Sequence, residues 1–138
     1  MTSASETDAI HKVVHGYYDA FGRDPAAASA FFAEPALIVV PGQIIVLATR
    51  ADVEAAIDGF AASLRASGFS HSKVGEHRVK LLNPTTALYS MIAIRMKTDG
   101  TELQPAGFTY LLHKSGSRWQ IYEFIATDLD KIWSTPIE

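Results

Sequence analysis

The sequence predicts a single α+β domain over residues 1–138, with helices packed on one face of a curved β-sheet. The first observation is the order of the elements, because the helical segments come early and four long strands follow residue 70. The second is that strands such as "LYSMIAI" and "WQIYEFI" are apolar on both faces. A sheet with one solvated face should alternate cleanly, so another subunit is expected to cover the second face.

The first helix is marked by apolar residues that recur at helical spacing. They form one stripe that should be buried: Ile10, Val13, Val14, Tyr17 and Phe21. Ser5 and Asp8 have the spacing of a capping box, which places the helix start. Gly22 is expected to end this helix.

A short second helix and two short strands are expected next. Asp24-Pro25 reads as the cap and first residue of a helix over residues 26–32, and Pro35 should end it. The segments 36–40 and 43–48 are rich in β-branched residues and are separated by a Pro-Gly turn. Both segments are therefore predicted as strands.

A third and longer helix follows a clear capping box made by Thr49 and Asp52. It should end near Gly68 and bury one apolar stripe: Val53, Ala56, Ile57, Phe60 and Leu64. Because this helix precedes the long strands, it belongs to the layer that covers the sheet.

The rest of the chain is predicted to form antiparallel strands, separated by Asn-Pro, Asp-Gly and Ser-Gly turns. Their expected bounds are 71–82, 85–97, 103–114 and 118–128. Pro105 should mark a bulge or an edge in the third of them. The tail "LDKIWSTPIE" is expected to contain one helical turn.

Composition excludes several functional classes. The net charge of −3 and the absence of a Lys/Arg run argue against a nucleic-acid partner. The chain has no cysteine, so disulfides, a zinc-thiolate site and a cysteine nucleophile are excluded. No signal peptide or membrane-spanning segment is visible, and we expect a cytoplasmic protein without a membrane partner.

The segments "VVHGYYDAFGRDPAAASAFFAEPALIVVPG" and "SGSRWQIYEFIATD", taken with the element order, resemble the nuclear transport factor 2-like superfamily. The SnoaL-like and ketosteroid-isomerase-like branch is the most similar. The resemblance covers almost the whole chain and implies a cystatin-like roll, in which a cone-shaped mixed sheet wraps around about three N-terminal helices and leaves a deep pocket. Members include isomerases, cyclases, dehydratases and non-catalytic binding proteins, so the fold alone selects no activity.

The resemblance also assigns roles to individual residues. The oxyanion-hole tyrosine of the isomerases corresponds to Tyr17, which is either a hydrogen-bond donor to a ligand oxygen or a core tyrosine. The isomerases' aspartate base is replaced by Val40, and their second acid by Phe108. Valine cannot move a proton, so the resemblance does not support a steroid-isomerase mechanism.

Glu123 is the most informative polar residue of the last strand. Strict alternation would place it on the face of Trp119 and Ile121, which the resemblance identifies as the pocket face, where relatives carry a histidine. There Glu123 would be a catalytic acid or base, or the structural partner of Arg95. A register shift of one residue would instead direct it away from the pocket.

Other residues are expected to bind the ligand or to lie near it. The pocket wall is predicted to include Tyr110, Phe108, Val40, Arg95, Ile121, Tyr89 and, as the weakest candidate, His77. His11 and His15 are four residues apart on the first helix, but no third metal ligand accompanies them, so we expect a solvated helix face and no metal.

Three functional hypotheses follow. The protein could be a cofactor-independent isomerase, cyclase or lyase for a small hydrophobic carbonyl compound, with Glu123 and Tyr17 as its catalytic residues. It could instead bind a small hydrophobic ligand without catalysis, or act as a dimerisation module. The first two share a small-molecule pocket and are favoured, and a homodimer through the sheet is expected in each case.

Overall fold

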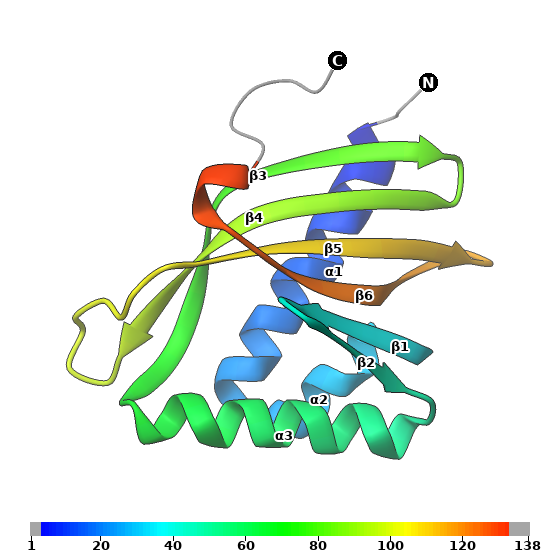
Figure 1. Ribbon diagram of the computed structural model, residues 1–138. Helices are drawn as coiled ribbons and strands as arrows, with labels where there is room; N and C mark the ends of the chain where they lie inside the picture. Colours follow the sequence, from blue (N-terminus) through cyan, green and yellow to red (C-terminus); the bar gives the residue numbers. More distant parts are fainter. Residues whose placement is uncertain (1–3, 133–138) are drawn as a thin grey trace.

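The computed structural model describes residues 4–132, with side chains from Glu6 onward, and confirms the predicted α+β architecture (Figure 1). The helical elements are α1 (Ala4–Arg23), α2 (Pro25–Ala28), the 3-10 turn η1 (Ser29–Phe31), α3 (Arg50–Ala66) and the 3-10 turn η2 (Leu129–Lys131). The strands are β1 (Phe32–Val40), β2 (Gln43–Leu47), β3 (Phe69–Asn83), β4 (Thr86–Lys97), β5 (Ala106–Ser115) and β6 (Arg118–Thr127).

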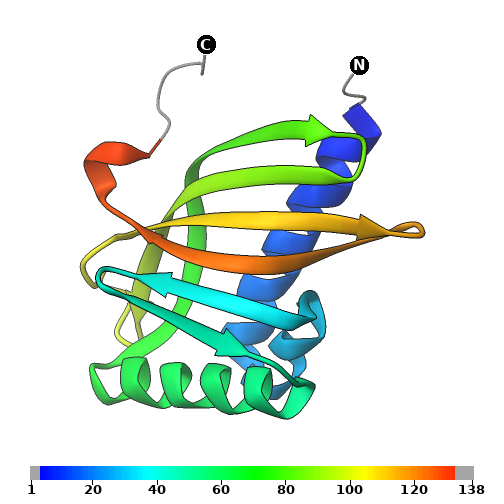
Figure 2. The ribbon, with the colours of Figure 1, turned by 45° about the vertical axis from the view of Figure 1, so that its right-hand side comes forward.

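The six strands form one mixed sheet in the order β2-β1-β6-β5-β4-β3. The β1–β6 pair is parallel, and the other neighbours are antiparallel. The sheet is curved and open, with α1 against its inner face and α3 across one end beside β2 (Figures 1 and 2). This arrangement is the cone-like roll that the family resemblance implies.

Helix α1 forms because its apolar residues recur on one face and are buried against the sheet. Ile10 and Val14 are fully buried, as are Tyr17, Tyr18 and Phe21 to within a few per cent. The helix continues past Gly22 to Arg23, so the predicted end is one residue early. The predicted capping box at Ser5 falls on a side chain outside the described part of the chain.

Helix α3 starts at the predicted capping box. The Asp52 backbone N–H donates to Thr49 Oγ1 at 3.2 Å, and the Thr49 N–H donates to Asp52 Oδ2 at 3.3 Å. These bonds satisfy two amide donors that the first helical turn leaves free. Val53 and Ile57 on the following turns are buried, so their side of α3 faces the inside of the cone.

The segment around Pro35 differs from the sequence prediction. The expected helix over 26–32 is shorter, and β1 already begins at Phe32, so Pro35 lies inside a strand. The pairing of β1 with β6 shifts register between Phe32 and Leu37, and a residue that cannot donate to a ladder is tolerated in such an irregular stretch.

The later strands match the prediction except at some ends. Strand β5 starts at Ala106, so Pro105 precedes the strand rather than forming a bulge within it. The predicted helical turn of the tail is η2, and the tail beyond Ile132 lies outside the described residues. Within residues 4–132, no helix is both long enough and apolar enough to cross a membrane.

Candidate functional site

A cavity of about 410 Å³ lies between α3, the β1–β2 hairpin and the inner face of β4, β5 and β6. Its lining is almost wholly apolar, with one cation and one phenol among the side chains. The lining residues are Tyr17, Phe32, Ile38, Val40, Ile45, Leu47, Val53, Ala56, Ile57, Phe60, Arg95, Phe108 and Phe124. A concave apolar space of this size is typical of small-molecule sites.

The cavity wall follows from two periodicities in the sequence. In β1 and β2 every second residue faces inward, which brings Ile38, Val40 and Ile45 to the cavity. The inner face of α3 adds Ala56 and Phe60 at helical spacing. The sequence pattern predicts these residues as a helix stripe and strands, but it indicates a site role for Val40 alone.

Among the described residues, Arg95 is the only charged one in the lining. It continues the inward alternation of β4 after Tyr89, Met91 and Ala93, all fully buried. Its guanidinium carbon lies 5.7 Å from the ring centre of Phe60 and 5.5 Å from that of Phe108. No carboxylate between residues 6 and 132 forms an ion pair with Arg95, so two aromatic faces hold the cation beside the cavity.

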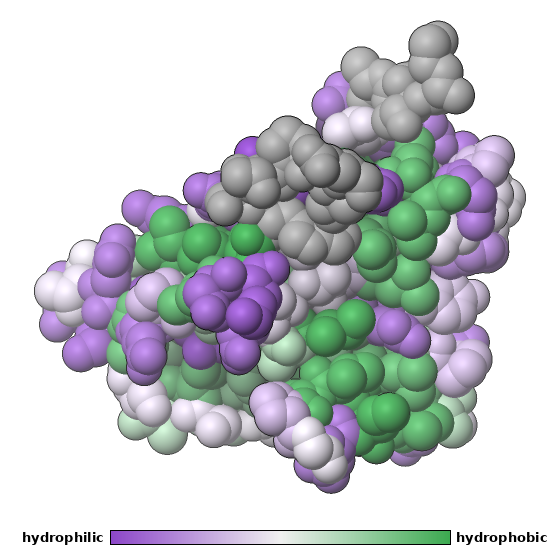
Figure 3. Space-filling model, turned by 45° about the horizontal axis from the view of Figure 1, so that its top comes forward, coloured by the Kyte–Doolittle hydropathy of each residue, from purple (hydrophilic) through white to green (hydrophobic). Residues whose placement is uncertain are grey.

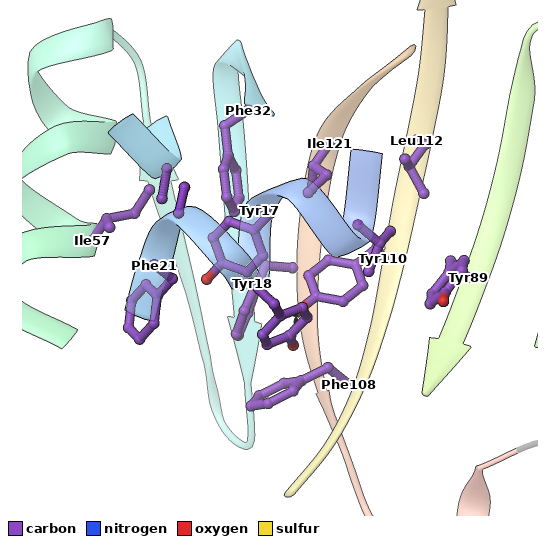
Figure 4. Close-up of a cluster of buried hydrophobic side chains, with 14 of the residues drawn as sticks. Tyr17, Tyr18, Phe21, Phe32, Ile57, Tyr89, Phe108, Tyr110, Leu112 and Ile121 are labelled. Carbon is purple, nitrogen blue, oxygen red and sulfur yellow. Dashed lines mark hydrogen bonds between the residues drawn. The ribbon is translucent and has the colours of Figure 1, made fainter. Parts of the chain in front are cut away.

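Tyr17 comes from the middle of α1 and lines the same cavity. Its ring lies between Phe32 and Tyr18, and its oxygen is on the side toward α3 (Figure 4). The hydroxyl has no hydrogen-bond partner among the described residues. Burial raises the pKa of Tyr17, and the Arg95 charge opposes this rise, so the phenol stays protonated and can donate a hydrogen bond.

The predicted orientation of Glu123 is wrong. Ile121 pairs with Leu112, whereas Glu123 pairs with Leu111, so β6 contains one extra residue, Tyr122, at this point. This β-bulge breaks the alternation. Glu123 therefore faces the outer side of the sheet, in a groove that it shares with Tyr122 and Leu111, and it cannot reach the cavity or Arg95.

The bulge has a physical reason in the side chains that follow it. Strict alternation after Ile121 would turn Glu123 inward and Phe124 outward. With the bulge, Phe124 is only 7% exposed and packs on Phe108 with a 4.6 Å centroid separation. Burying an aromatic ring is favourable by about 2 kcal/mol, whereas burying an unpaired carboxylate is strongly unfavourable.

The remaining predicted site residues divide into two groups. Val40 and Phe108 line the cavity. Ile121, Tyr110 and Tyr89 face the inner side but are fully buried in the core that fills the other end of the cone, so the cavity does not reach them. His77 lies beside this core and outside the cavity lining.

Two phenols in this core are paired with each other. The Tyr110 hydroxyl forms a short hydrogen bond with the hydroxyl of Tyr18, which also donates to Met91 Sδ at 3.4 Å (Figure 4). Burial raises the pKa of both Tyr18 and Tyr110 well above the usual phenol range. Both hydroxyls are therefore structural and are unavailable to a ligand in the cavity.

A histidine cluster lies at the opposite end from the cavity. The ring of His11 is 3.9 Å from that of His15 and 4.6 Å from that of His77, measured between centroids. His11 Nδ1 is hydrogen bonded to the Tyr89 hydroxyl at 2.8 Å. The described residues contain no group of three or more acidic, histidine or cysteine side chains arranged to hold a metal ion. The helix face that carries His11 and His15 is predicted from the sequence to be solvated. It is only partly exposed, because His11 contacts His77 of β3 and Tyr89 of β4.

Comparison with known proteins agrees with this architecture. The profile of the NTF2-like protein family DUF6841 matches residues 6–129. No protein of curated function matches the chain significantly. The family match spans most of the chain, so the chain belongs to this NTF2-like family.

Solved structures show the same fold at low identity. An NTF2-like protein with a cystatin-like fold from Novosphingobium aromaticivorans is 19% identical, with a TM-score of 0.73, over 94% of this chain and 86% of that chain. Aln2 from a Streptomyces species is 15% identical, with a TM-score of 0.74, over 94% and 95% of the two chains. An NTF2-like protein of unknown function from Shewanella oneidensis is 21% identical, with a TM-score of 0.71, over 89% and 99%.

Proposed function

We propose that this NTF2-like protein binds a small, largely apolar molecule in the cavity beneath α3. The observation that carries the proposal is the cavity itself, which has a volume of about 410 Å³ and a lining with one cation and one free phenol. Transfer of an apolar surface from water into such a lining is favourable by roughly 25 cal/mol per Å². The few polar groups at its wall would orient the ligand.

We favour binding without proton transfer over SnoaL-like isomerase or cyclase chemistry. Val40 and Phe108, which stand where isomerases carry acids, both line the cavity. No lining residue of the described chain has a carboxylate or an imidazole, and Glu123 lies on the other face of the sheet. A proton-abstraction mechanism needs a base within hydrogen-bond reach of the substrate, and these side chains supply none.

Tyr17 gives the ligand a specific contact. Its hydroxyl is at the cavity wall and has no partner among residues 6–132, so it can donate to a carbonyl oxygen of the bound molecule. A hydroxyl that opens onto an apolar cavity is a ready donor for a ligand oxygen, and such a contact fixes the orientation of the ligand. The favoured neutral ligand is therefore an apolar molecule with one carbonyl group.

The test is calorimetric titration with the aromatic ketone 2-acetonaphthone. Ala56 lines the cavity, whereas its neighbour Ala55 is exposed on the outer side of α3. We expect Ala56→Phe to weaken ketone binding about tenfold or more by filling the cavity, and Ala55→Phe to leave it unchanged. Equal affinities in the two variants, at equal thermal stability, would contradict binding in this cavity.

We further propose that two copies associate through the outer face of the sheet. Apolar side chains gather on this face (Figure 3), and Leu37, Val46 and Leu111 line a groove there. Val46 and its strand neighbour Ile44 are 64% and 65% exposed, which is high for large apolar residues of a sheet. A second copy would offer the same apolar surface, as a twofold interface requires.

Light scattering coupled to size exclusion tests the association. The wild-type mass should be twice the chain mass of 15.0 kDa, and Val46→Asp should shift it toward the monomer, because a charge would enter an apolar interface. Ala55→Asp introduces the same charge at an exposed position of α3, and this variant should remain dimeric. A monomeric wild type would overturn this part of the proposal.

A further inference from the structure

We infer that the natural ligand is an apolar monocarboxylate whose head group is bound by Arg95. This inference rests on the proposed function, because it names the ligand class of the same cavity. It goes beyond a generic apolar pocket because it assigns one residue the role of selecting charge.

Backbone and side-chain contacts both position Arg95. Its side chain emerges on the inner face, and its backbone carbonyl accepts a hydrogen bond from Leu103 N–H at 2.8 Å. Phe60 on α3 and Phe108 on β5 hold the guanidinium at 5.7 and 5.5 Å. These contacts place the charge beside the cavity.

The hydrogen-bonding capacity of Arg95 is unused in the described part of the chain. A cation–π contact involves the charge of the guanidinium and consumes none of its N–H donors. No acceptor among the described residues takes a hydrogen bond from these donors. A carboxylate accepts two parallel N–H bonds from this fork, which is the pairing that suits guanidinium geometry best.

The electrostatic surroundings favour an anion over a neutral ligand. Arg95 is the only charged group that residues 6–132 contribute to the lining, and the other lining side chains are apolar apart from the Tyr17 phenol. Arg95 is partly buried, and a charge in partly apolar surroundings attracts an opposite charge more strongly than it would in bulk water. The field reaches the tyrosines of α1 and β5, since Arg95 opposes the rise in the pKa of Tyr17, Tyr18 and Tyr110.

The geometry also divides the ligand into a head and a body. The carboxylate would lie at Arg95, and the Tyr17 hydroxyl is a further donor in the same lining. The body would occupy the apolar part formed by Ile38, Ile45 and Ile57. A molecule with a charged group at each end does not fit this division, because the second charge would be buried without a partner.

The experiment compares two probes that share one ring system, 2-naphthoate and 2-acetonaphthone, by calorimetric titration of the wild type. A charge-assisted pair with Arg95 should make naphthoate bind about tenfold or more tightly than the ketone. In Arg95→Met this preference should disappear, with ketone affinity within about threefold of wild type. Arg95→Lys should keep part of the preference, because the charge remains and the fork is lost.

The control variant is Arg23→Met, which removes an exposed cation that is already paired with Asp19 at 2.6 Å. It should bind both probes as the wild type does. Equal affinity of the wild type for the two probes would overturn the inference while leaving apolar binding intact. A parallel loss of both probes in Arg95→Met would also overturn it, because Arg95 would then only support the cavity wall. Binding of neither probe would overturn both proposals.

Discussion

The two ends of the concave face of the sheet are built from the same kinds of residue but are completed differently. Away from α3 the cone is filled, and its phenols are hydrogen bonded: Tyr18 with Tyr110, and Tyr89 with His11. Beneath α3 it is open, and both Tyr17 and Arg95 line a cavity without a hydrogen-bond partner among the described residues. The filled end therefore provides stability, and the open end provides a site whose polar groups are left for a ligand.

The largest expected effect is a loss of stability when a core side chain at the filled end is shortened. Leu112 is fully buried between β-sheet neighbours and α1, so Leu112→Ala should lower the free energy of unfolding by about 2–5 kcal/mol. Ile45→Ala at the cavity wall should cost about 1 kcal/mol or less, because part of that side chain already faces open space. Urea denaturation measures both values, and similar losses would remove the distinction between the two ends.

A smaller difference in stability is expected between substitution of the hydrogen-bonded Tyr18 and substitution of the cavity residue Tyr17. Tyr18→Phe leaves the Tyr110 hydroxyl buried without its partner, which should lower the free energy of unfolding by about 1–3 kcal/mol. Tyr17→Phe removes a hydroxyl that has no partner in the described chain, so it should cost less than about 0.5 kcal/mol and weaken ketone binding instead. The reverse order of stabilities would show that Tyr17 is structural.

The histidine cluster predicts a pH dependence that belongs to the filled end. Burial, then the neighbouring His15 and His77, lower the pKa of His11, against an opposing effect of Asp8. Burial and His77 also lower the pKa of His15. The unfolded chain then binds more protons between the lowered values and 6.5, so stability is greatest above about pH 6.5 and falls as the pH drops from there toward the folded pKa values.

Thermal melts at several pH values measure this effect. His15→Gln should flatten the loss of stability below pH 6.5, because it removes one cation from the cluster and one repulsion on His11. His71→Gln, on the exposed start of β3, is the matched control and should leave the slope unchanged. An unaltered slope in His15→Gln would assign the pH dependence to other groups.

The smallest effect is expected at Glu123, the residue that strict alternation would place in the pocket. Because it faces the outer groove, Glu123→Gln should change ligand affinity less than about twofold and the free energy of unfolding less than about 0.5 kcal/mol. Calorimetry and a denaturation curve of the same sample provide the check. A large loss of affinity would place the ligand on the outer face instead.

Comparison of Arg95 with Glu123 shows how far the sequence defines the site. Inward alternation in β4 continues without interruption from Ala87 to Arg95, so period-two reasoning places Arg95 on the inner face. In β6 one inserted residue exchanges the inward and outward positions of all residues after Ile121. A signal was available, because only a bulge keeps both Ile121 and Phe124 inside and the carboxylate outside.

The fold was predictable because its determinants are local and repeated. Capping residues, turn residues and apolar stripes specify most helices and strands independently of one another. The cavity was less predictable, because an unfilled space depends on the distance between α3 and the sheet rather than on any single segment. The start of β1 at Phe32 shows the same limit, since pairing with Ile121 of a distant strand extends it past Pro35.

The bulge at Tyr122 also makes β6 tolerant of a change in its length. If the codon for Tyr122 were deleted, regular alternation from Ile121 would still send Glu123 outward and Phe124 inward. The strand can therefore lose one residue at this position without exchanging its two faces. Such a deletion leaves the inner wall of the cone unchanged, and the buried ring of Phe124 packed on Phe108 fixes which side of the strand remains inside.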